Sequence, residues 1–215
     1  MTGGHRQLVS IATDAVRLEG VLALPAQPVG LVLFAHGSGS SRQSPRNSAV
    51  AAALREVQVA TLLMDLLSED ENHDTAMRFD IAMLVRRLGA AADWIADHHL
   101  TRDLPLGLFG GSTGAAAALT LAARRPGVVR ALVVRGGRPD LAGTEVLPAV
   151  RAPTLLIAGG LDTEVVALNR AALQQLQCEC RLDVIPGASH LFEEPGRLPI
   201  VIALALDWFE RHLHA

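Results

Sequence analysis

A serine stands among glycines in the segment FGGSTGAAAA, residues 109–118, just before a run of alanines. Residues 110–114 (GGSTG) match G-x-S-x-G, the pattern of a nucleophile elbow, in which a serine occupies a sharp turn between a strand and a helix. Glycines suit such a turn because the strand and the helix approach too closely for larger side chains. A tight turn without chemistry would show the same pattern, so Ser112 is a candidate nucleophile that requires partners elsewhere in the chain.

Two residues far down the chain supply such partners. Asp162 follows the apolar run APTLLIAGG, and His190 follows CRLDVIPGA. Enzymes with this elbow carry their triad in the order serine, acid, histidine. His190 would take the proton of the weakly nucleophilic serine, and Asp162 would hold the imidazole in the required tautomer. Taken singly, the aspartate is equally compatible with a helix cap and the histidine with a solvated loop residue.

An attacking serine creates a negative oxygen that needs hydrogen-bond donors. The backbone N–H of Thr113, the residue after the nucleophile, is the first expected donor. The second is the backbone N–H of Ser38, in the segment HGSGSS that follows another apolar run, GLVLFA. This segment is small enough for close approach to a substrate, although a flexible turn would have the same composition.

The elements expected to position these residues alternate along the chain. Short apolar runs typical of buried strands end in glycine or polar residues, and they are separated by longer segments of helical period. Residues 79–97 and a segment that starts near Pro199 are the clearest helices. Residues 7–25 predict an opening antiparallel hairpin with its turn near Asp14. The pattern predicts an α/β fold with a mostly parallel sheet, and residues 1–215 as one domain.

Composition excludes several other functions. The net charge is −3, which gives no reason to expect nucleic-acid binding, and no apolar run is long enough for a membrane span. All 19 basic residues are arginine, which excludes a Schiff-base lysine and a P-loop lysine. Cys178 and Cys180 are expected to be free thiols. We expect no cofactor, and no metal site because no paired Cys or His cluster lies at ligand spacing. We expect a cytoplasmic location, because the first residues do not resemble a signal peptide. An edge strand or an exposed helix face would permit a homodimer.

These motifs together resemble the α/β-hydrolases, specifically the dienelactone hydrolase family. The resemblance covers nearly the whole chain and rests on the strings HGSGSSRQSPRN, LLMDLL, FGGSTGAAAAL, RGGRPDLAG, APTLLIAGGLD and PGASHLFEEPG. It is closest to a hydrolase-like module that also occurs joined to a phosphoribosyltransferase domain. It implies an α/β-hydrolase fold with helices on both faces of the sheet, and Ser112, Asp162 and His190 as the triad. Dienelactone hydrolases proper carry a cysteine as nucleophile, so dienelactone cleavage is not implied, and nothing here resembles a pyrophosphate-binding loop.

Substrate-binding residues are harder to choose. Arg42 follows the predicted oxyanion segment, Asp65 and Arg135 stand at other strand ends, and an arginine there can bind a substrate carboxylate or phosphate through two hydrogen bonds. The alternative is that the arginines pair with the acidic segment SEDENHD or with Glu193 and Glu194. Only about 17 residues separate the strand that ends near Arg135 from the next one, which leaves no room for a cap domain. An open site favours accessible acyl substrates of modest size.

The leading hypothesis is therefore a serine hydrolase, a carboxylesterase or a dienelactone-hydrolase-like enzyme, that cleaves an ester or related acyl bond of a small molecule through an acyl-enzyme. Thioesters and lactones would use the same residues. The alternative from another class is a non-catalytic hydrolase-like module that assembles with a partner such as a phosphoribosyltransferase.

Overall fold

The computed structural model describes residues 4–13 and 16–213, which form an eight-stranded sheet in the order β1-β2-β4-β3-β5-β6-β7-β8. β2 pairs antiparallel with β1 and with β4, and the remaining neighbours are parallel. The predicted, mostly parallel sheet is thus confirmed. The strands are β1 (His5–Thr13), β2 (Val16–Leu24), β3 (Gly30–Ala35), β4 (Val59–Met64), β5 (Leu106–Gly111), β6 (Val129–Arg135), β7 (Thr154–Gly159) and β8 (Cys180–Ile185).

Burial follows the position of each strand in the sheet. β3, β4, β5 and β7 are buried along their whole length, as expected for central strands covered on both faces. β1 lies at an edge and alternates, so that Leu8 is exposed while Ile11 is buried. The predicted hairpin is confirmed as β1 and β2, but its turn near Asp14 lies outside the described residues.

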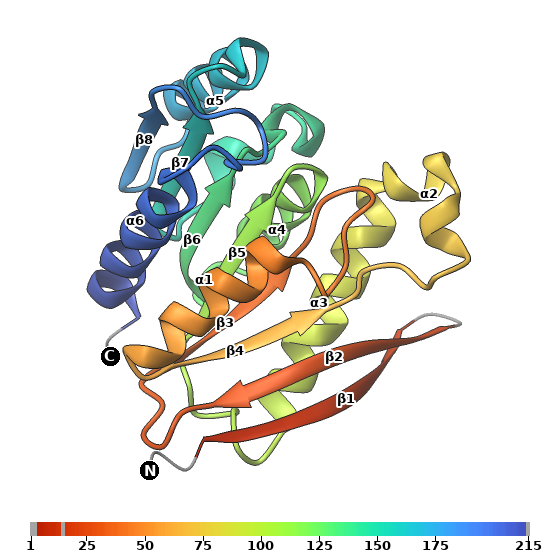
Figure 1. The fold of residues 1–215 in the computed structure, drawn as a ribbon. Helices are drawn as coiled ribbons and strands as arrows, with labels where there is room; N and C mark the ends of the chain where they lie inside the picture. Colours follow the sequence, from red (N-terminus) through yellow and green to blue (C-terminus); the bar gives the residue numbers. More distant parts are fainter. Residues whose placement is uncertain (1–3, 14–15, 214–215) are drawn as a thin grey trace.

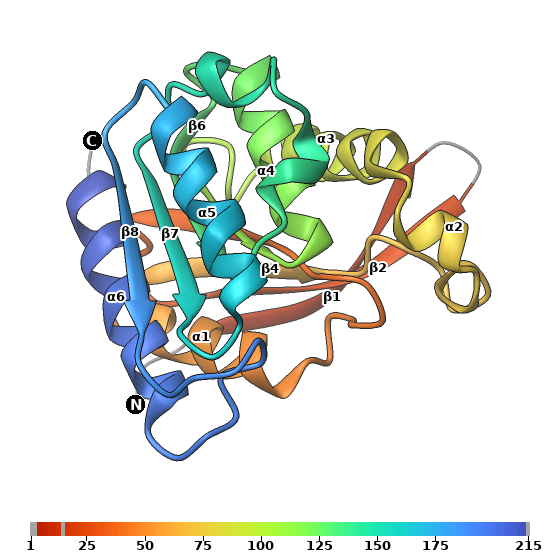
Figure 2. The ribbon, with the colours of Figure 1, turned by 90° about the horizontal axis from the view of Figure 1, so that it is seen from above.

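Helices cover both faces of the sheet. α1 and α6 pack on one face, and α3, α4 and α5 lie on the other (Figure 1, Figure 2). The α-helices are α1 (Pro45–Glu56), α2 (Thr75–Arg78), α3 (Ile81–Asp97), α4 (Thr113–Arg124), α5 (Thr163–Gln175) and α6 (Arg197–His212). The three short 3-10 helices are η1 (Glu71–His73), η2 (Pro139–Ala142) and η3 (Leu147–Ala149).

The two helices predicted most clearly form close to their expected positions. α3 starts at Ile81 rather than at 79, because the carboxylate of Asp80 caps it by accepting the Met83 N–H at 2.9 Å. α6 starts at Arg197, two residues before Pro199, and buries Trp208. α1 and α5 are not marked by a clear apolar periodicity, because half of the residues that each turns into the core are asparagine or alanine.

The connection from β6 to β7 holds only η2 and η3 among its secondary-structure elements, so no cap domain is inserted there. Within residues 4–13 and 16–213, no helix is long and apolar enough to cross a membrane.

Candidate active site

Ser112 stands where β5 ends and α4 begins, with φ 49° and ψ −121°. Such a backbone is strained for a residue with a side chain, and strain of this kind gathers at functional sites. Gly114 explains why the turn is so tight: a Cβ there would lie 2.2 Å from the carbonyl oxygen of Ala35. At Gly110 a Cβ would lie 2.7 Å from Ala115 Cα. The geometry expected of a nucleophile elbow is therefore present around Ser112.

His190 and Asp162 come together although they are 28 residues apart. His190 lies in the segment after β8, and its Nδ1 is 2.7 Å from Oδ2 of Asp162. The carboxylate can accept the Nδ1 proton, which leaves Nε2 as the basic nitrogen of the neutral ring. His190 and Ser112 line the same cavity. The structure thus brings the three residues of the predicted triad to one end of the sheet.

Asp162 also caps a helix. It is the residue before α5, and its second carboxylate oxygen, Oδ1, accepts the N–H of Val165 at 3.4 Å. The two interpretations of this aspartate, helix cap and histidine partner, therefore hold at once, one for each oxygen. Because the capping bond fixes the carboxylate, it also fixes the direction from which His190 is held.

The two predicted oxyanion donors differ in whether the N–H already donates a hydrogen bond within the protein. The Thr113 N–H is in the first turn of α4, where amides have no partner within the helix. The Ser38 N–H already donates to Oγ1 of Thr113 at 2.9 Å. This bond ties the segment after β3 to the residue beside the nucleophile. A substrate oxygen would have to share or replace that acceptor, which the sequence did not suggest.

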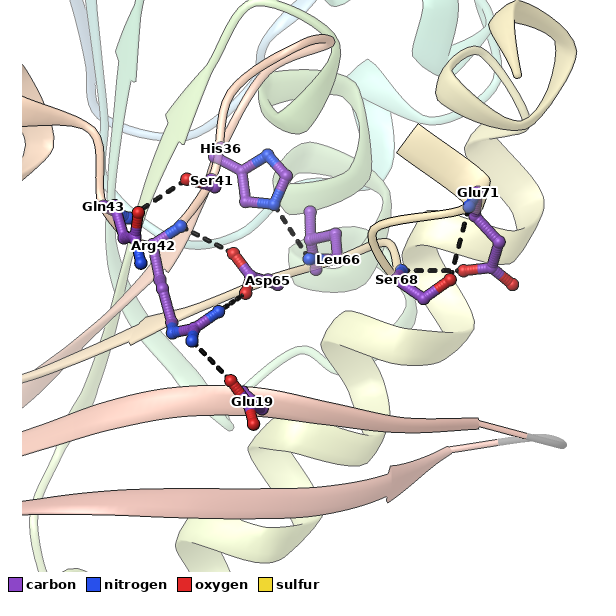
Figure 3. Close-up of polar contacts among 9 residues, drawn as sticks. All are labelled: Glu19, His36, Ser41, Arg42, Gln43, Asp65, Leu66, Ser68 and Glu71. Atoms are coloured by element: carbon purple, nitrogen blue, oxygen red, sulfur yellow. Dashed lines mark hydrogen bonds and ion pairs between the residues drawn. The ribbon is translucent and has the colours of Figure 1, made fainter. Parts of the chain in front are cut away.

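The segment after β3 is held in place by buried polar contacts (Figure 3). His36 is buried, and its Nε2 accepts the N–H of Leu66 at 2.8 Å while Nδ1 lies 3.0 Å from the Gly37 carbonyl oxygen. Burial lowers the pKa of His36, so the ring stays neutral and can accept at Nε2. At Gly37 a Cβ would lie 2.7 Å from Ser112 Cβ, so the chain passes directly over the nucleophile.

Arg42 and Asp65, two of the predicted substrate-binding residues, bind each other (Figure 3). The Arg42 N–H also donates to the Asp65 carboxylate at 2.7 Å, and its guanidinium contacts Glu19 on β2. Both line a second cavity of about 520 Å³ rather than the one that contains Ser112. Their contacts are those of a brace for the segment after β3.

The cavity at Ser112 has a volume of about 490 Å³ and is lined mainly by polar residues and glycines, with Pro45 and Leu191 among them. It includes Arg135, the third predicted substrate-binding residue, and Arg46, which pairs with Glu193. Sequence reasoning missed Gln43, Asn72 and Leu191, which also line it. The position of Leu191 next to His190 was an available signal. Asn72 carried none, because only the fold brings η1 back to this cavity.

Glu71 and Arg87 hold the segment around η1 against α3. Both carboxylate oxygens of Glu71 accept from the guanidinium at 2.7 Å, and the Ser68 N–H donates to the same carboxylate at 2.9 Å. Arg87 is 3% exposed and also donates to the Leu66 carbonyl. The hydrogen bonds from Arg87 are the largest cause that lowers the pKa of Glu71 to about 2. The acidic segment thus pairs with Arg87 and not with the arginines of the cavity.

Replacing Glu71 with glutamine is expected to lower the free energy of unfolding at pH 7 by about 2–3 kcal/mol. A carboxyl group whose pKa is depressed in the folded state stabilises the protein above its ordinary pKa, and this contribution is lost as pH falls. The difference between wild type and Glu71→Gln should therefore shrink as pH falls from 4.5 toward 2. Urea unfolding of both proteins from pH 7 to pH 3 measures this; a difference that stays constant would contradict the pairing.

The sheet order, the strained serine after β5 and the uncapped connection after β6 define an α/β-hydrolase fold. A family model described as "Alpha/beta hydrolase domain" matches residues 28–200, and the chain belongs to this family. It is 52% identical to a crystal structure described as dienelactone hydrolase from Anabaena variabilis, with a TM-score of 0.94 and coverage of 98% of this chain and 99% of that one. The expected resemblance to dienelactone hydrolases is thus confirmed.

Other relatives are longer or more distant. A Mycobacterium tuberculosis protein named "Putative phosphoribosyl transferase" is 51% identical over 205 residues, which are 95% of this chain and 46% of the relative. The chain therefore spans about half the length of the curated relatives it matches. A Xanthomonas campestris structure described as an a/b serine hydrolase without lid shares the fold at 22% identity, with a TM-score of 0.80 and coverage of 98% and 96%.

Proposed function

We propose that this protein is a serine hydrolase that cleaves an ester or related acyl bond, with Ser112 as nucleophile, His190 as base and Asp162 as its partner. The observation that carries the proposal is the strained Ser112 in a cavity shared with a histidine whose Nδ1 is 2.7 Å from a carboxylate. A strained backbone, a shared cavity and a fixed imidazole are the features that activate a serine hydroxyl. A purely structural turn needs neither a shared cavity nor a fixed imidazole.

In the acylation step, Oγ of Ser112 attacks the carbonyl carbon of the substrate while Nε2 of His190 takes the hydroxyl proton. Asp162 keeps the Nδ1 proton and stabilises the imidazolium that forms. The carbonyl oxygen becomes negative and accepts hydrogen bonds from the Thr113 N–H and the Ser38 N–H. The Ser38 N–H gives up its hydrogen bond to the Thr113 hydroxyl to do so. His190 then gives its proton to the leaving alcohol as the C–O bond breaks.

In the deacylation step, a water molecule replaces the alcohol. His190 takes a proton from the water as its oxygen attacks the acyl-enzyme, and the proton returns to Ser112 as the ester to the serine breaks. The products are a carboxylic acid and the free enzyme, and each proton that His190 accepts is passed on. Thioesters and lactones fit the same sequence of steps.

The cavity suits compact, polar acyl groups. It has about 490 Å³ of space, and Leu191 is the single large apolar side chain among its described lining residues. No cap covers the connection after β6. A long acyl chain would find few large apolar side chains to pack against, so short acyl groups are the expected substrates.

A second candidate is a hydrolase-like module that serves only to assemble with a transferase domain. It is favoured by one observation, that the chain spans 46% of relatives named as phosphoribosyl transferases. Such a module would not turn over esters, so the same experiment separates the two candidates.

The purified protein is expected to hydrolyse p-nitrophenyl butyrate and to lose this activity progressively with a fluorophosphonate, which reacts with activated serines. The measurement is the release of p-nitrophenol before and after inactivation. Hydrolysis no faster than in buffer, together with no covalent fluorophosphonate adduct on the protein, would favour the assembly module.

A further inference from the structure

Arg135 is a buried cation for which the described residues provide no counterion. It is the last residue of β6 and is 9% exposed, and no hydrogen bond or ion pair joins its side chain to residues 4–13 or 16–213. Burial, aided by the charge of Arg46, lowers the pKa of Arg135 to about 10, so the side chain is still charged at neutral pH. Buried charges are costly unless they are paired. The fold therefore keeps a charge whose partner must come from outside the described chain.

The position of this guanidinium is fixed by packing. Arg135 pairs in register with Gly111, the residue before the nucleophile. A Cβ at Gly111 would lie 3.0 Å from Nη2 of Arg135, so the middle glycine of the GGS turn leaves space for the guanidinium. On another side, the ring of Phe192 lies 6.0 Å from the guanidinium carbon. Arg135 is thus held beside Ser112 by residues that offer it no charge.

Arg46 adds a second positive charge to the same cavity. It stands in the first turn of α1, whose N-terminus carries a partial positive charge. Its Nε, like that of Arg135, is buried without a hydrogen-bond acceptor in the described structure. Its partner Glu193 is 61% exposed and does not line the cavity. The described lining residues include no aspartate or glutamate, so the cavity is electropositive.

The donors around these arginines suit an anion with more than two oxygens. A carboxylate has two oxygens and is satisfied by one guanidinium. Here two guanidinium groups and the hydroxyls of Ser40, Ser41 and Ser44 line one cavity, next to a helix N-terminus. Phosphate, with three free oxygens and up to two negative charges, matches that donor set better.

We propose that Arg135 and Arg46 form an anion subsite beside Ser112 that binds a phosphate group, so that the substrate is an ester that also carries a phosphate. That the phosphate belongs to an ester substrate rests on the proposed hydrolase function. Binding of phosphate by the subsite does not depend on that function. It assigns to Arg135 the role of binding the substrate, and to Gly111 the role of making room for it.

The test uses inorganic phosphate as the probe. Millimolar phosphate is expected to raise the melting temperature of the wild-type protein, and of Ser112→Ala, above their values in sodium chloride of equal ionic strength. It should also inhibit hydrolysis of p-nitrophenyl butyrate competitively. In Arg135→Met the inhibition constant is expected to rise by about tenfold or more, and the thermal shift should disappear.

Arg138→Met is the matched control. Arg138 lies three positions further on, pairs with Asp140 outside the cavity, and should leave the phosphate effects as in wild type. Without phosphate, Arg135→Met should melt no lower than wild type, because it removes an unpaired buried charge. If Arg135→Met does not fold, the proposal is tested on wild type alone, by comparing inhibition and thermal shift in phosphate, in succinate as a carboxylate probe, and in chloride.

Equal phosphate inhibition of wild type and Arg135→Met would overturn the proposal. So would a phosphate effect no greater than that of chloride, or stronger inhibition by succinate than by phosphate. The thermal shift of Ser112→Ala does not depend on catalysis. A phosphate-induced thermal shift that requires Arg135, in a protein without esterase activity, would therefore reject the proposed hydrolase function and support the anion subsite. Esterase activity without that shift would support the hydrolase function and reject the anion subsite.

Discussion

Replacing Ser112 with alanine is expected to lower kcat for p-nitrophenyl butyrate by about 10⁴- to 10⁶-fold. The substitution removes the atom that would form the acyl-enzyme, while the Thr113 amide and the cavity remain. The residual rate would come from those binding elements alone. Steady-state hydrolysis by the two purified proteins, corrected for the rate in buffer, measures the effect.

Stability provides the control for this variant. Alanine keeps a Cβ at φ 49°, so the strain at position 112 should persist and the melting temperature should stay close to that of wild type. Ser112→Gly, in contrast, relieves the strain and should stabilise the fold by about 1 kcal/mol while being equally inactive. A Ser112→Ala protein that is folded and retains more than a tenth of the wild-type rate would contradict the nucleophile assignment.

Asp162→Asn is expected to lower kcat by about 10³- to 10⁴-fold. An amide in this position can donate to Nδ1 of His190, which would favour the tautomer with the proton on Nε2. That ring cannot accept the Ser112 proton. The measurement is kcat for the same ester over a range of pH values.

The two roles of Asp162 can be separated by comparing asparagine with alanine. Asparagine keeps an oxygen for the Val165 N–H and is an equally good helix cap, so Asp162→Asn should remain nearly as stable as wild type. Asp162→Ala loses the cap and should cost about 1 kcal/mol of unfolding free energy in addition to the activity. If Asp162→Asn hydrolyses the ester as fast as wild type, then Asp162 is only a cap.

Much of the fold follows from local patterns in the sequence. Continuous apolar runs that end in glycine indicated the central strands, because a parallel strand covered on both faces needs apolar side chains at every position. The GGSTG turn was recognisable because its glycines stand where a larger side chain would clash. At Gly114, for example, a Cβ would lie 2.2 Å from the Ala35 carbonyl oxygen. α1 and α5 were not predicted because half of their core-facing residues are asparagine or alanine, which gives a weak apolar pattern.

The lining of the site was only partly predictable, because ion pairing depends on tertiary contacts. Arg42 and Arg135 were equal candidates in sequence, the first after the predicted oxyanion segment and the second at a strand end. In the structure Arg42 pairs with Asp65 and Glu19, Arg46 pairs with the exposed Glu193, and Arg135 has no counterion among the described residues. Likewise, no pattern indicated that the Ser38 amide would donate to the Thr113 hydroxyl.

The most direct test of the central claim is to locate the residue that a fluorophosphonate modifies. The intact protein should gain one adduct, and peptide mass spectrometry should place it on Ser112 within the segment FGGSTGAAAA. Labelling should be lost in Ser112→Ala and slowed strongly in Asp162→Asn. An adduct on any other residue, or equal labelling of wild type and Ser112→Ala, would contradict the assignment of Ser112 as the nucleophile.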